Sequence, residues 1–516
     1  MARYPTCNQI VTSYAEWRRE RSFGMSKTGR RTGTIKRHAP LPGNSTPVAR
    51  NGMADVSNGD FLAPVADSVS LPQPREPRST AEPMHTLPEV RSYDGVLEHT
   101  LRVSHQTLHV GDHSLRTYAY NGTVPGEVLR LQPGDRLKLR LDNATGPTGT
   151  AGSARSGELL TPVTTSAGLR MRGSKGTGSR RGNDVPAHLA PGDSQRYEYE
   201  VPADHPAGLH WYRIGIYDEA TRTTLPGPAV PMIITGDIDR AAQIRSIRER
   251  TMVLTALPVR GSDTAPDLSV NGRLHPEIDI RPGEIQRWRV LNADPDESVW
   301  LHVDGHTLYQ VGQDGIPFSD PHPARSIMLA PGNRAELLVR ANRAGHYRIY
   351  SGHIAGTGSP AHASTEVATL AVDGRPMFNR MPRELIEAPE FPTHPVVQHR
   401  KVHLGVAAAE THDGLTVTAG TVEEWTLIND DAQERSVHLH GNPFQVLDMQ
   451  GAGPGDPCRQ TDPSVWRDTH RLPPNGQMTV RTYIRPDTTG STVYRCRVAA
   501  SDHRGLTDTL SVTPAH

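Results

Sequence analysis

A segment of about two dozen residues occurs three times along this chain of 516 residues. The copies are YNGTVPGEVLRLQPGDRLKLRLDN at 120–143, VNGRLHPEIDIRPGEIQRWRVLN at 270–292 and the fainter HDGLTVTAGTVEEWTLIND at 412–430. Each contains a short strand-like run, a Pro-Gly or Ala-Gly turn, and an alternating run that ends in Asn. Because self-similarity at a fixed spacing marks a repeated structural unit, three related domains are predicted.

The runs between the turns alternate apolar and polar residues, as in LEHTLRVSHQTLHV and QRYEYEVP, and Gly, Pro, Asn and Asp bound them. Alternation with turn signals every 8 to 12 residues predicts an all-β fold of antiparallel β-sandwiches. The strongest helical pattern, IDRAAQIRSIRERT, predicts one helix near 238–251. The predicted parts are a disordered tail at 1–88, a first domain at 89–237 with a Gly/Arg-rich insert, and two further domains at 238–385 and 386–516.

Charge and hydropathy exclude some partners. The chain has 56 basic and 56 acidic side chains, so its formal net charge is zero and a polycation built for nucleic acid is excluded. No run approaches the roughly 18 to 20 apolar residues of a membrane helix. Neither a nucleic acid nor a membrane is therefore predicted as a partner, and the oligomeric state stays open.

The cysteine count and the N-terminal residues bear on location. Three cysteines in a chain of this length cannot build a disulfide framework, which favours a reducing compartment. The first residues, MARYPTCNQIVTSYAEWRRERSF, contain no apolar core of an export signal. Both observations predict a cytoplasmic protein.

Several ordered motifs resemble those of the multicopper oxidases, the family of laccases and phenoxazinone synthase. AGLHWYRIGIY at 207–217 resembles the family's G-x-x-W-Y-H-S-H, and HTLYQVGQDGIPF with LAPGNRAELLVRA resembles signatures of its middle domain. RSVHLHGNPFQVL, WRDTHRLPPNG and VYRCRVAASDHRGL resemble its C-terminal H-P-x-H-x-H-G, W-x-D-T and H-C-H motifs. The resemblance implies three cupredoxin-like Greek-key β-sandwiches.

The same resemblance implies a copper chemistry that this chain lacks the ligands for. The family uses a blue copper bound by Cys and two His, and a trinuclear cluster bound by four H-x-H pairs. A guanidinium is always protonated and offers no lone pair to a metal. The motifs place the missing ligands at Thr164, Ser166, Arg213, Gly215, Arg435, Arg495, Arg497 and Ser501, and leave Cys496, Leu506, His438 and His440 in place. No copper cofactor is therefore predicted.

The remaining polar residues are the candidate site. His438 and His440 alternate on one predicted strand, where they serve as an acid/base pair, hold a remnant metal, or pack in a domain interface. Cys496 between two arginines is either a reactive thiolate or an inherited buried cysteine, and His503 is a candidate stand-in for a lost imidazole. The candidate anion-binding residues, which alternatively only fill the old copper cavity, are Arg213, Arg435, Arg495 and Arg497.

Three functions remain open at this point. The first is a copper-free enzyme of bacterial specialised metabolism that binds an anionic small molecule between the first and third domains. The second is a noncatalytic scaffold that resembles the copper-less, exported cell-division relatives of the family. The third is a copper-dependent oxidoreductase with an atypical site.

Overall fold

The computed structural model describes residues 82–110, 113–145, 158–159, 163–164, 170–171, 189–218, 223–257, 267–352, 364–404, 415–453, 456, 461–488, 490–498 and 506–515. In some strand segments, among them 490–498 and 506–509, only the backbone is described. The predictions for the N-terminal tail up to residue 81, for most of the Gly/Arg-rich insert and for His503 lie outside these residues.

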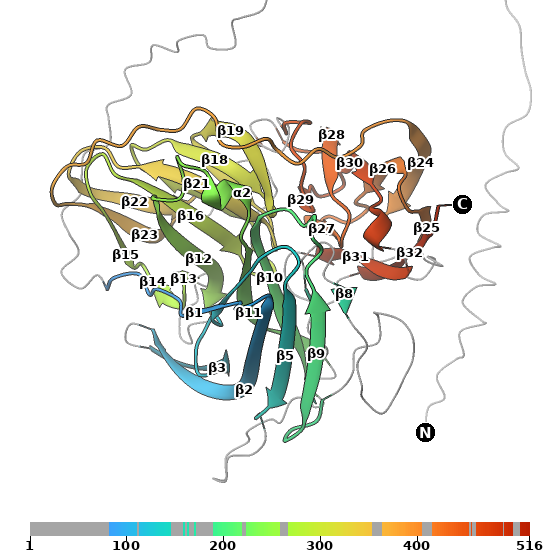
Figure 1. The fold of residues 1–516 in the computed structure, drawn as a ribbon, viewed down its shortest axis with the longest axis horizontal. Coiled ribbons are helices and arrows are strands. Elements are labelled where there is room, and N and C mark those ends of the chain that lie inside the picture. Colours follow the sequence, from blue (N-terminus) through green and yellow to red (C-terminus); the bar gives the residue numbers. More distant parts are fainter. Residues whose placement is uncertain are drawn as a thin grey trace, which may run out of the picture. The chain divides into compact units, whose positions relative to one another are not determined.

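The first β-sandwich contains a six-stranded sheet, in the order β1-β4-β11-β10-β6 with β7 also on β10, and a five-stranded sheet β3-β2-β5-β9-β8 (Figure 1). Apolar side chains from both sheets, such as Leu101, Leu139 and Ile214, form its core. Its strands are β1 (Glu89–Arg91), β2 (Val96–Val110), β3 (His113–Tyr120), β4 (Val128–Leu131), β5 (Arg136–Asn143), β6 (Glu158–Leu159), β7 (Val163–Thr164), β8 (Arg170–Met171), β9 (Ser194–Glu200), β10 (Gly208–Asp218) and β11 (Thr223–Ile234).

The second sandwich contains a seven-stranded sheet β14-β13-β12-β16-β21-β18-β19 and a five-stranded sheet β15-β23-β22-β17-β20. Its core is built around the fully buried Trp288. Its strands are β12 (Arg248–Leu257), β13 (Asp267–Val270), β14 (Arg273–Leu274), β15 (Glu277–Ile280), β16 (Ile285–Asn292), β17 (Val299–Val303), β18 (Leu308–Gln313), β19 (Ile316–Ala324), β20 (Ser326–Leu329), β21 (Arg334–Arg340), β22 (Gly345–Ser351) and β23 (Thr365–Val372).

The third sandwich contains a four-stranded sheet β24-β26-β30-β28 and a five-stranded sheet β25-β32-β31-β27-β29. Trp425, Phe444 and Met478 contribute to its core. Its elements are β24 (Val396–His403), β25 (Leu415–Thr418), β26 (Val422–Ile428), β27 (Arg435–Leu439), β28 (Phe444–Gln450), β29 (Thr469–Leu472), β30 (Gln477–Tyr483), the 3-10 helix η3 (Pro486–Thr488), β31 (Gly490–Val498) and β32 (Leu506–Thr513). The predicted set of three β-sandwiches is confirmed.

The sequence repeat corresponds to one structural unit in each sandwich. Its copies form β4 and β5, β15 and β16, and β25 and β26, and in each pair the chain crosses from one sheet to the other. The turns contain Gly134, Gly283 and Gly420 at φ of 88°, 74° and 78°, a region that favours glycine because it has no Cβ. The repeated Pro-Gly and Ala-Gly pairs therefore encode the crossover.

The asparagine that ends each copy holds the loop that follows. Asn292 is fully buried, and its Oδ1 accepts a hydrogen bond from the backbone N–H of Asp294 at 3.1 Å. Its Nδ2 donates to the carbonyl oxygens of Glu297 and Leu329, both at 2.8 Å. Asn143 and Asn429 likewise accept from the N–H two residues ahead and donate to carbonyl oxygens.

We expect the substitution Asn292→Leu to lower the free energy of unfolding by about 2 to 4 kcal/mol, because a side chain of similar size leaves three backbone groups, two of them in the buried residues Asp294 and Leu329, without their partner. Urea unfolding measures this change. The matched control is Asn342→Leu, since Asn342 is exposed and its side-chain amide donates to the carbonyl oxygen of the exposed Gly305. Equal losses in the two variants would contradict the role assigned to the buried asparagine.

Two local expectations differ from the structure. The helix predicted at 238–251 is wrong beyond Arg240: α2 spans Asp237–Arg240, and Arg248–Leu257 forms β12, which pairs in parallel with β16 and buries Met252 and Leu254. Residues 82–88, assigned to the disordered tail, are described, and Met84 packs into the second core. In both segments, tertiary burial outweighs the local pattern.

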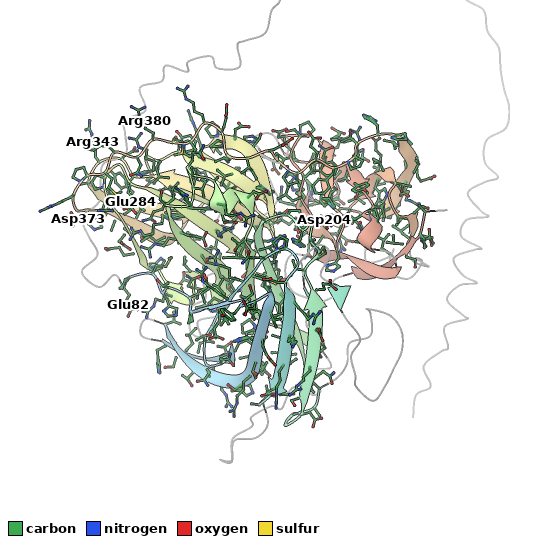
Figure 2. All side chains as sticks on the ribbon, in the orientation of Figure 1. Glu82, Asp204, Glu284, Arg343, Asp373 and Arg380 are labelled. Atoms are coloured by element: carbon green, nitrogen blue, oxygen red, sulfur yellow. The ribbon has the colours of Figure 1, made fainter. Side chains whose placement is uncertain are left out.

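Charged residues lie at the surface of the second sandwich. Arg343, Asp373 and Arg380 are exposed and lie at its periphery in Figure 2. Among the described helices, none is long and apolar enough to span a bilayer.

Candidate functional site

Strand β27 carries the predicted His438 and ends directly before His440, and it lies at the seam between the second and third sandwiches. Val437 and Leu439 belong to the third core, and alternation along the strand places Ser436 and His438 on the opposite face. There, the hydroxyl of Ser436 donates to the carbonyl oxygen of Pro331, in the second sandwich, at 2.8 Å. The strand therefore serves as an interdomain contact.

The imidazole of His438 is fixed at one nitrogen only. Nδ1 lies 2.9 Å from the hydroxyl oxygen of Thr469 and 3.4 Å from Oδ1 of Asp468. Nε2 is buried and has no hydrogen-bond partner within the described part of the chain. The ring of His440 lies 5.9 Å away, centroid to centroid, at an interplanar angle of 65°. The predicted histidine pair is thus brought together.

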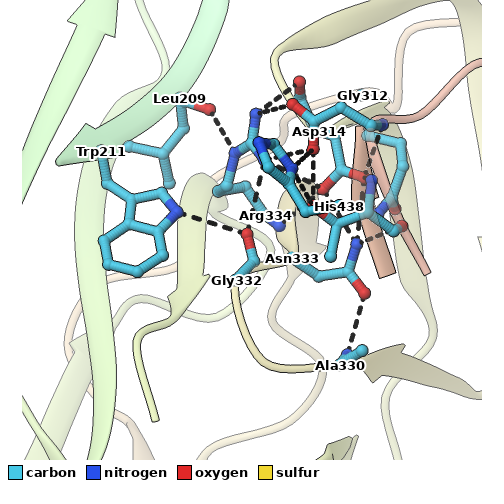
Figure 3. A network of polar contacts seen from close by, with 12 residues as sticks. Leu209, Trp211, Gly312, Asp314, Ala330, Gly332, Asn333, Arg334 and His438 are labelled. Carbon is cyan, nitrogen blue, oxygen red and sulfur yellow. Dashed lines mark hydrogen bonds and ion pairs between the residues drawn. The ribbon is translucent and has the colours of Figure 1, made fainter. Parts of the chain in front are cut away.

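A buried ion network joins His438 to the other two sandwiches (Figure 3). Arg334 on β21 donates to both carboxylate oxygens of Asp468, at 2.7 and 2.8 Å. It also donates to the carbonyl oxygens of Asp314 at 2.7 Å and of Leu209, in the first sandwich, at 3.0 Å. One fully buried guanidinium therefore connects all three sandwiches.

Asp314 completes this network from the turn between β18 and β19. Its carboxylate accepts hydrogen bonds from Asn333 Nδ2 at 3.0 Å, and from the backbone N–H groups of Arg334 at 2.9 Å, Asp468 at 3.2 Å and Thr469 at 3.1 Å. Asn333 Nδ2 also donates to the carbonyl oxygen of Thr469 at 2.8 Å. The carboxylate of Asp314 and the amide of Asn333 are thus paired with backbone groups on both sides of the seam between the second and third sandwiches.

The pKa values of the two carboxyl groups shift in opposite directions. Burial raises the pKa of Asp468, but the Arg334 guanidinium and His438 outweigh burial and hold it well below its usual value. Burial and the neighbouring Asp468 charge raise the pKa of Asp314 above its usual value. Asp468 is therefore the ionised partner of Arg334.

Arg213 contacts the second sandwich. Its guanidinium donates to the carbonyl oxygen of Ala293, and its Cζ lies 4.5 Å above the ring centroid of Trp211. Trp211 Nε1 donates to the carbonyl oxygen of Gly332 at 3.3 Å. The side chain of Arg213 is buried at this seam.

Arg435 lies on the other face of β27 from His438. Its side chain is 1% exposed, Nε donates to Oδ1 of Asn429 at 3.1 Å, and the guanidinium forms an ion pair with Asp431. Alternation along the strand therefore places Arg435 on the face opposite His438, and Arg435 stays a candidate for anion binding.

The other candidate residues are placed only through the backbone of β31. In its register on β27, Arg495 pairs with His438, Cys496 with Val437 and Arg497 with Ser436. Arg495 and Arg497 thus stay candidates for anion binding, and Cys496 a candidate thiolate. His503 lies outside the described residues.

The central residues Asp314, Arg334 and Asp468 were missed as functional candidates. All three lie in motifs that the sequence shows, the QDG, PGNR and WRDT segments. The available signal was that these segments, far apart along the chain, contain charged residues of opposite sign. Buried charges are normally paired, so such residues are candidates for an ion pair.

A second buried histidine lies near the network. His210 is 2% exposed, and its ring lies 4.9 Å from that of His205. Neither ring nitrogen of His210 has a hydrogen-bond partner among the described residues. Burial first, then the charges of His205 and Arg334, hold the pKa of His210 well below its usual value, while Asp468 opposes the shift.

We expect the free energy of unfolding to fall as the pH drops below about 6.5, because the unfolded chain then binds a proton at His210 that the folded chain excludes. His210→Leu removes this difference, so its stability should depend less steeply on pH, by up to about 1.4 kcal/mol per pH unit. Urea unfolding at pH 5 and pH 7 measures both slopes. An unchanged slope in the variant would show that other groups control the acid sensitivity.

Comparison with known proteins gives the family. The multicopper oxidase family models match residues 243–375 and 390–516, which together are just over half of the chain. The chain belongs to the multicopper oxidase family.

The similar proteins with a curated name include cell division proteins and a laccase. The cell division protein FtsP of Xenorhabdus nematophila is 22% identical over 441 residues, covering 78% of this chain and 87% of the relative. FtsP of Yersinia pestis is 24% identical, covering 77% and 86%. A laccase of Bacillus stratosphericus is 21% identical, covering 75% and 85%.

Solved structures agree on the fold. A multicopper oxidase from Campylobacter jejuni matches at a TM-score of 0.65 and 17% identity, covering 84% of this chain and 96% of that chain. McoA from Aquifex aeolicus matches at 0.66 and 17% identity, covering 84% and 100%. The predicted three-domain cupredoxin-like fold is thus confirmed.

The described residues do not fit the copper centres that the family implies. Arg213 and Arg435 stand at ligand positions and have no lone pair to donate, and Gly215 has no side chain. Among the residues that the structure describes, no group of three or more His, Cys, Asp or Glu is placed to hold a metal ion. His438 and His440 alone cannot provide the ligands of three coppers.

The predicted cytoplasmic location is contradicted by the similarity to the cell division protein FtsP. The reason for the error is physical. A low cysteine count shows only that the fold does not depend on disulfides, and a β-sandwich with a large core needs none in any compartment.

Proposed function

We propose that this chain is a copper-independent, noncatalytic member of the multicopper oxidase family that acts as a binding scaffold in cell division. The observation that carries the proposal is the state of the two described arginines at copper-ligand positions. Both are buried, and both are engaged by acceptors of the protein itself, Ala293 for Arg213 and Asn429 with Asp431 for Arg435.

Two further observations support a scaffold. The three sandwiches are joined by a buried network centred on Arg334, which suits a rigid body that presents surfaces. Several curated relatives, aligned over most of their length, are named cell division proteins.

The test is complementation in the organism that carries the gene. Deletion should lengthen the cells, and the wild-type gene should restore their length. The double variant Cys496→Ser/His440→Gln should restore it equally, because a scaffold needs neither a thiolate nor an imidazole. Failure of this variant, despite an unchanged circular dichroism spectrum and melting temperature, would contradict a noncatalytic role. Unchanged cell length after deletion would contradict a role in division.

An enzyme that binds an anionic small molecule, in a biosynthetic context, is the second candidate. The register of β31 on β27 supports it, because Arg495 and Arg497 pair with His438 and Ser436 on the strand of the predicted site. A thermal-shift screen with anionic metabolites tests it. A ligand that raises the melting temperature of the wild type, but not of Arg495→Ala, would favour the enzyme over the scaffold.

A further inference from the structure

We propose that Arg213 and Arg435 act as built-in replacements for metal ions: each supplies a permanent cation that joins separate chain segments where the family binds copper. The proposal concerns how the fold is held together, and it stands whether or not the protein acts in cell division.

Arg435 closes the loop between β26 and β27 in the third sandwich. It begins β27, while Asn429 and Asp431 follow β26, so the guanidinium connects the start of β27 to the end of the repeat. The side-chain amide of Asn429 also holds this loop. Its Nδ2 donates to the carbonyl oxygens of Gln433 and Pro473, and its Oδ1 accepts from the N–H of Asp431. Arg435 thus links Asn429 and its loop to β27, the strand on which the family has a histidine ligand of the blue copper.

Arg213 joins two sandwiches. It lies on β10 of the first sandwich and donates to Ala293, which directly follows β16 of the second. Its guanidinium also lies over the face of Trp211, and Trp211 itself donates to the carbonyl oxygen of Gly332 in the second sandwich. A cation held over an indole face and by a carbonyl dipole is stabilised without a metal. Arg213 and Trp211 therefore fasten the same seam.

The partners of both arginines are acceptors, as ligands of a cation must be. A guanidinium presents five N–H donors in a fixed fork, so it can be held by the acceptors that a protein fold supplies. Unlike a bound metal ion, it is part of the chain and cannot be removed by a chelator or a reductant. It also repels any metal cation that approaches. The stability of the fold therefore does not depend on copper, and the two guanidinium groups keep copper ions from binding at these positions.

Substitution of either residue tests the proposal. Arg435→Met and Arg213→Met should each lower the melting temperature by about 5 °C or more. Arg435→Met removes the ion-pair partner of the Asp431 carboxylate, and Arg213→Met removes a donor to the buried carbonyl group of Ala293. Arg435→Lys should recover part of the loss through its charge on Asp431. Arg116→Met, at an exposed arginine of β3, is the matched control and should melt like the wild type.

Copper provides the second arm and requires no variant. Purified wild-type protein, dialysed against copper(II) sulfate and then against buffer, should retain less than one tenth of an equivalent of copper, and copper should not raise its melting temperature. The double variant Arg213→His/Arg435→His should melt below the wild type with or without copper. Stoichiometric copper that stabilises the wild type would overturn the proposal, as would methionine variants that melt like the Arg116→Met control.

Discussion

Replacing Arg334 with methionine is expected to lower the free energy of unfolding by about 3 to 5 kcal/mol, because removing one partner of a buried ion pair leaves an uncompensated buried charge. Arg334 donates to both oxygens of Asp468 and to the carbonyl oxygens of Asp314 and Leu209. Methionine fills a similar volume and makes none of these bonds. Urea unfolding followed by fluorescence measures the loss, and the separation of the sandwiches should accompany it.

A double-mutant cycle separates the ion pair from packing. Asp468→Asn should also destabilise, and the double variant Arg334→Met/Asp468→Asn should lose less than the sum of the two, because the two side chains share one interaction. Arg340→Met is the matched control, since Arg340 ends the same strand and is exposed. Additive losses, or a loss in Arg334→Met no larger than in the control, would contradict the assigned role of the network.

The fold was predictable from the sequence because its signals are local. The alternation in RLKLRLDN at 136–143 corresponds to the burial pattern of β5, in which every second residue is buried. The glycines of the repeat, such as Gly134, mark a backbone conformation that the residue type itself reveals. Family motifs of several residues in fixed order then gave the three-sandwich architecture.

The site was predictable only in part, because pairing across sandwiches depends on contacts between distant segments. His438 lies on β27 and His440 directly follows the end of that strand, so their proximity followed from two-residue spacing. The partner of Arg213, a backbone carbonyl of Ala293, has no signal in the sequence, because every residue carries a carbonyl group. The helical pattern of 238–251 likewise gave no sign that its last residues, from Arg248 on, pair with β16 as part of β12.

A second ion cluster, between β12, β16, β21 and α2, shows how the first two sandwiches are joined. The guanidinium of Arg289 is fully buried and lies against three carboxylates, those of Asp239, Glu249 at 2.8 Å and Glu336 at 2.5 Å. Arg130 of the first sandwich lies 2.6 Å from the other oxygen of Glu249. The cluster thus extends from the second sandwich to the first.

The pKa values of Glu249 and Asp239 show how the arginines of this cluster affect its carboxyl groups. Burial raises the pKa of Glu249, but Arg289 and Arg130 outweigh burial, so the pKa lies well below its usual value. The pKa of Asp239 is likewise lowered, since Arg289 and Arg287 outweigh its burial. The carboxylates therefore stay ionised in the fold only because arginines compensate them.

Arg289→Met should accordingly cost about 3 to 5 kcal/mol at pH 7, and the cost should shrink toward pH 5. Loss of Arg289 should raise the pKa values of Asp239 and Glu249 in the fold, because Arg289 is the charge that lowers each of them most. The folded variant should then bind more protons than the folded wild type as the pH falls, so the difference in stability between the two shrinks. Urea unfolding of the wild type and the variant at pH 7, 6 and 5 measures this trend. Arg343→Met, at an exposed position, is the control. A cost that is the same at all three pH values would mean that Arg289 contributes through packing, and the assignment of an electrostatic seam between the first two sandwiches would then be wrong.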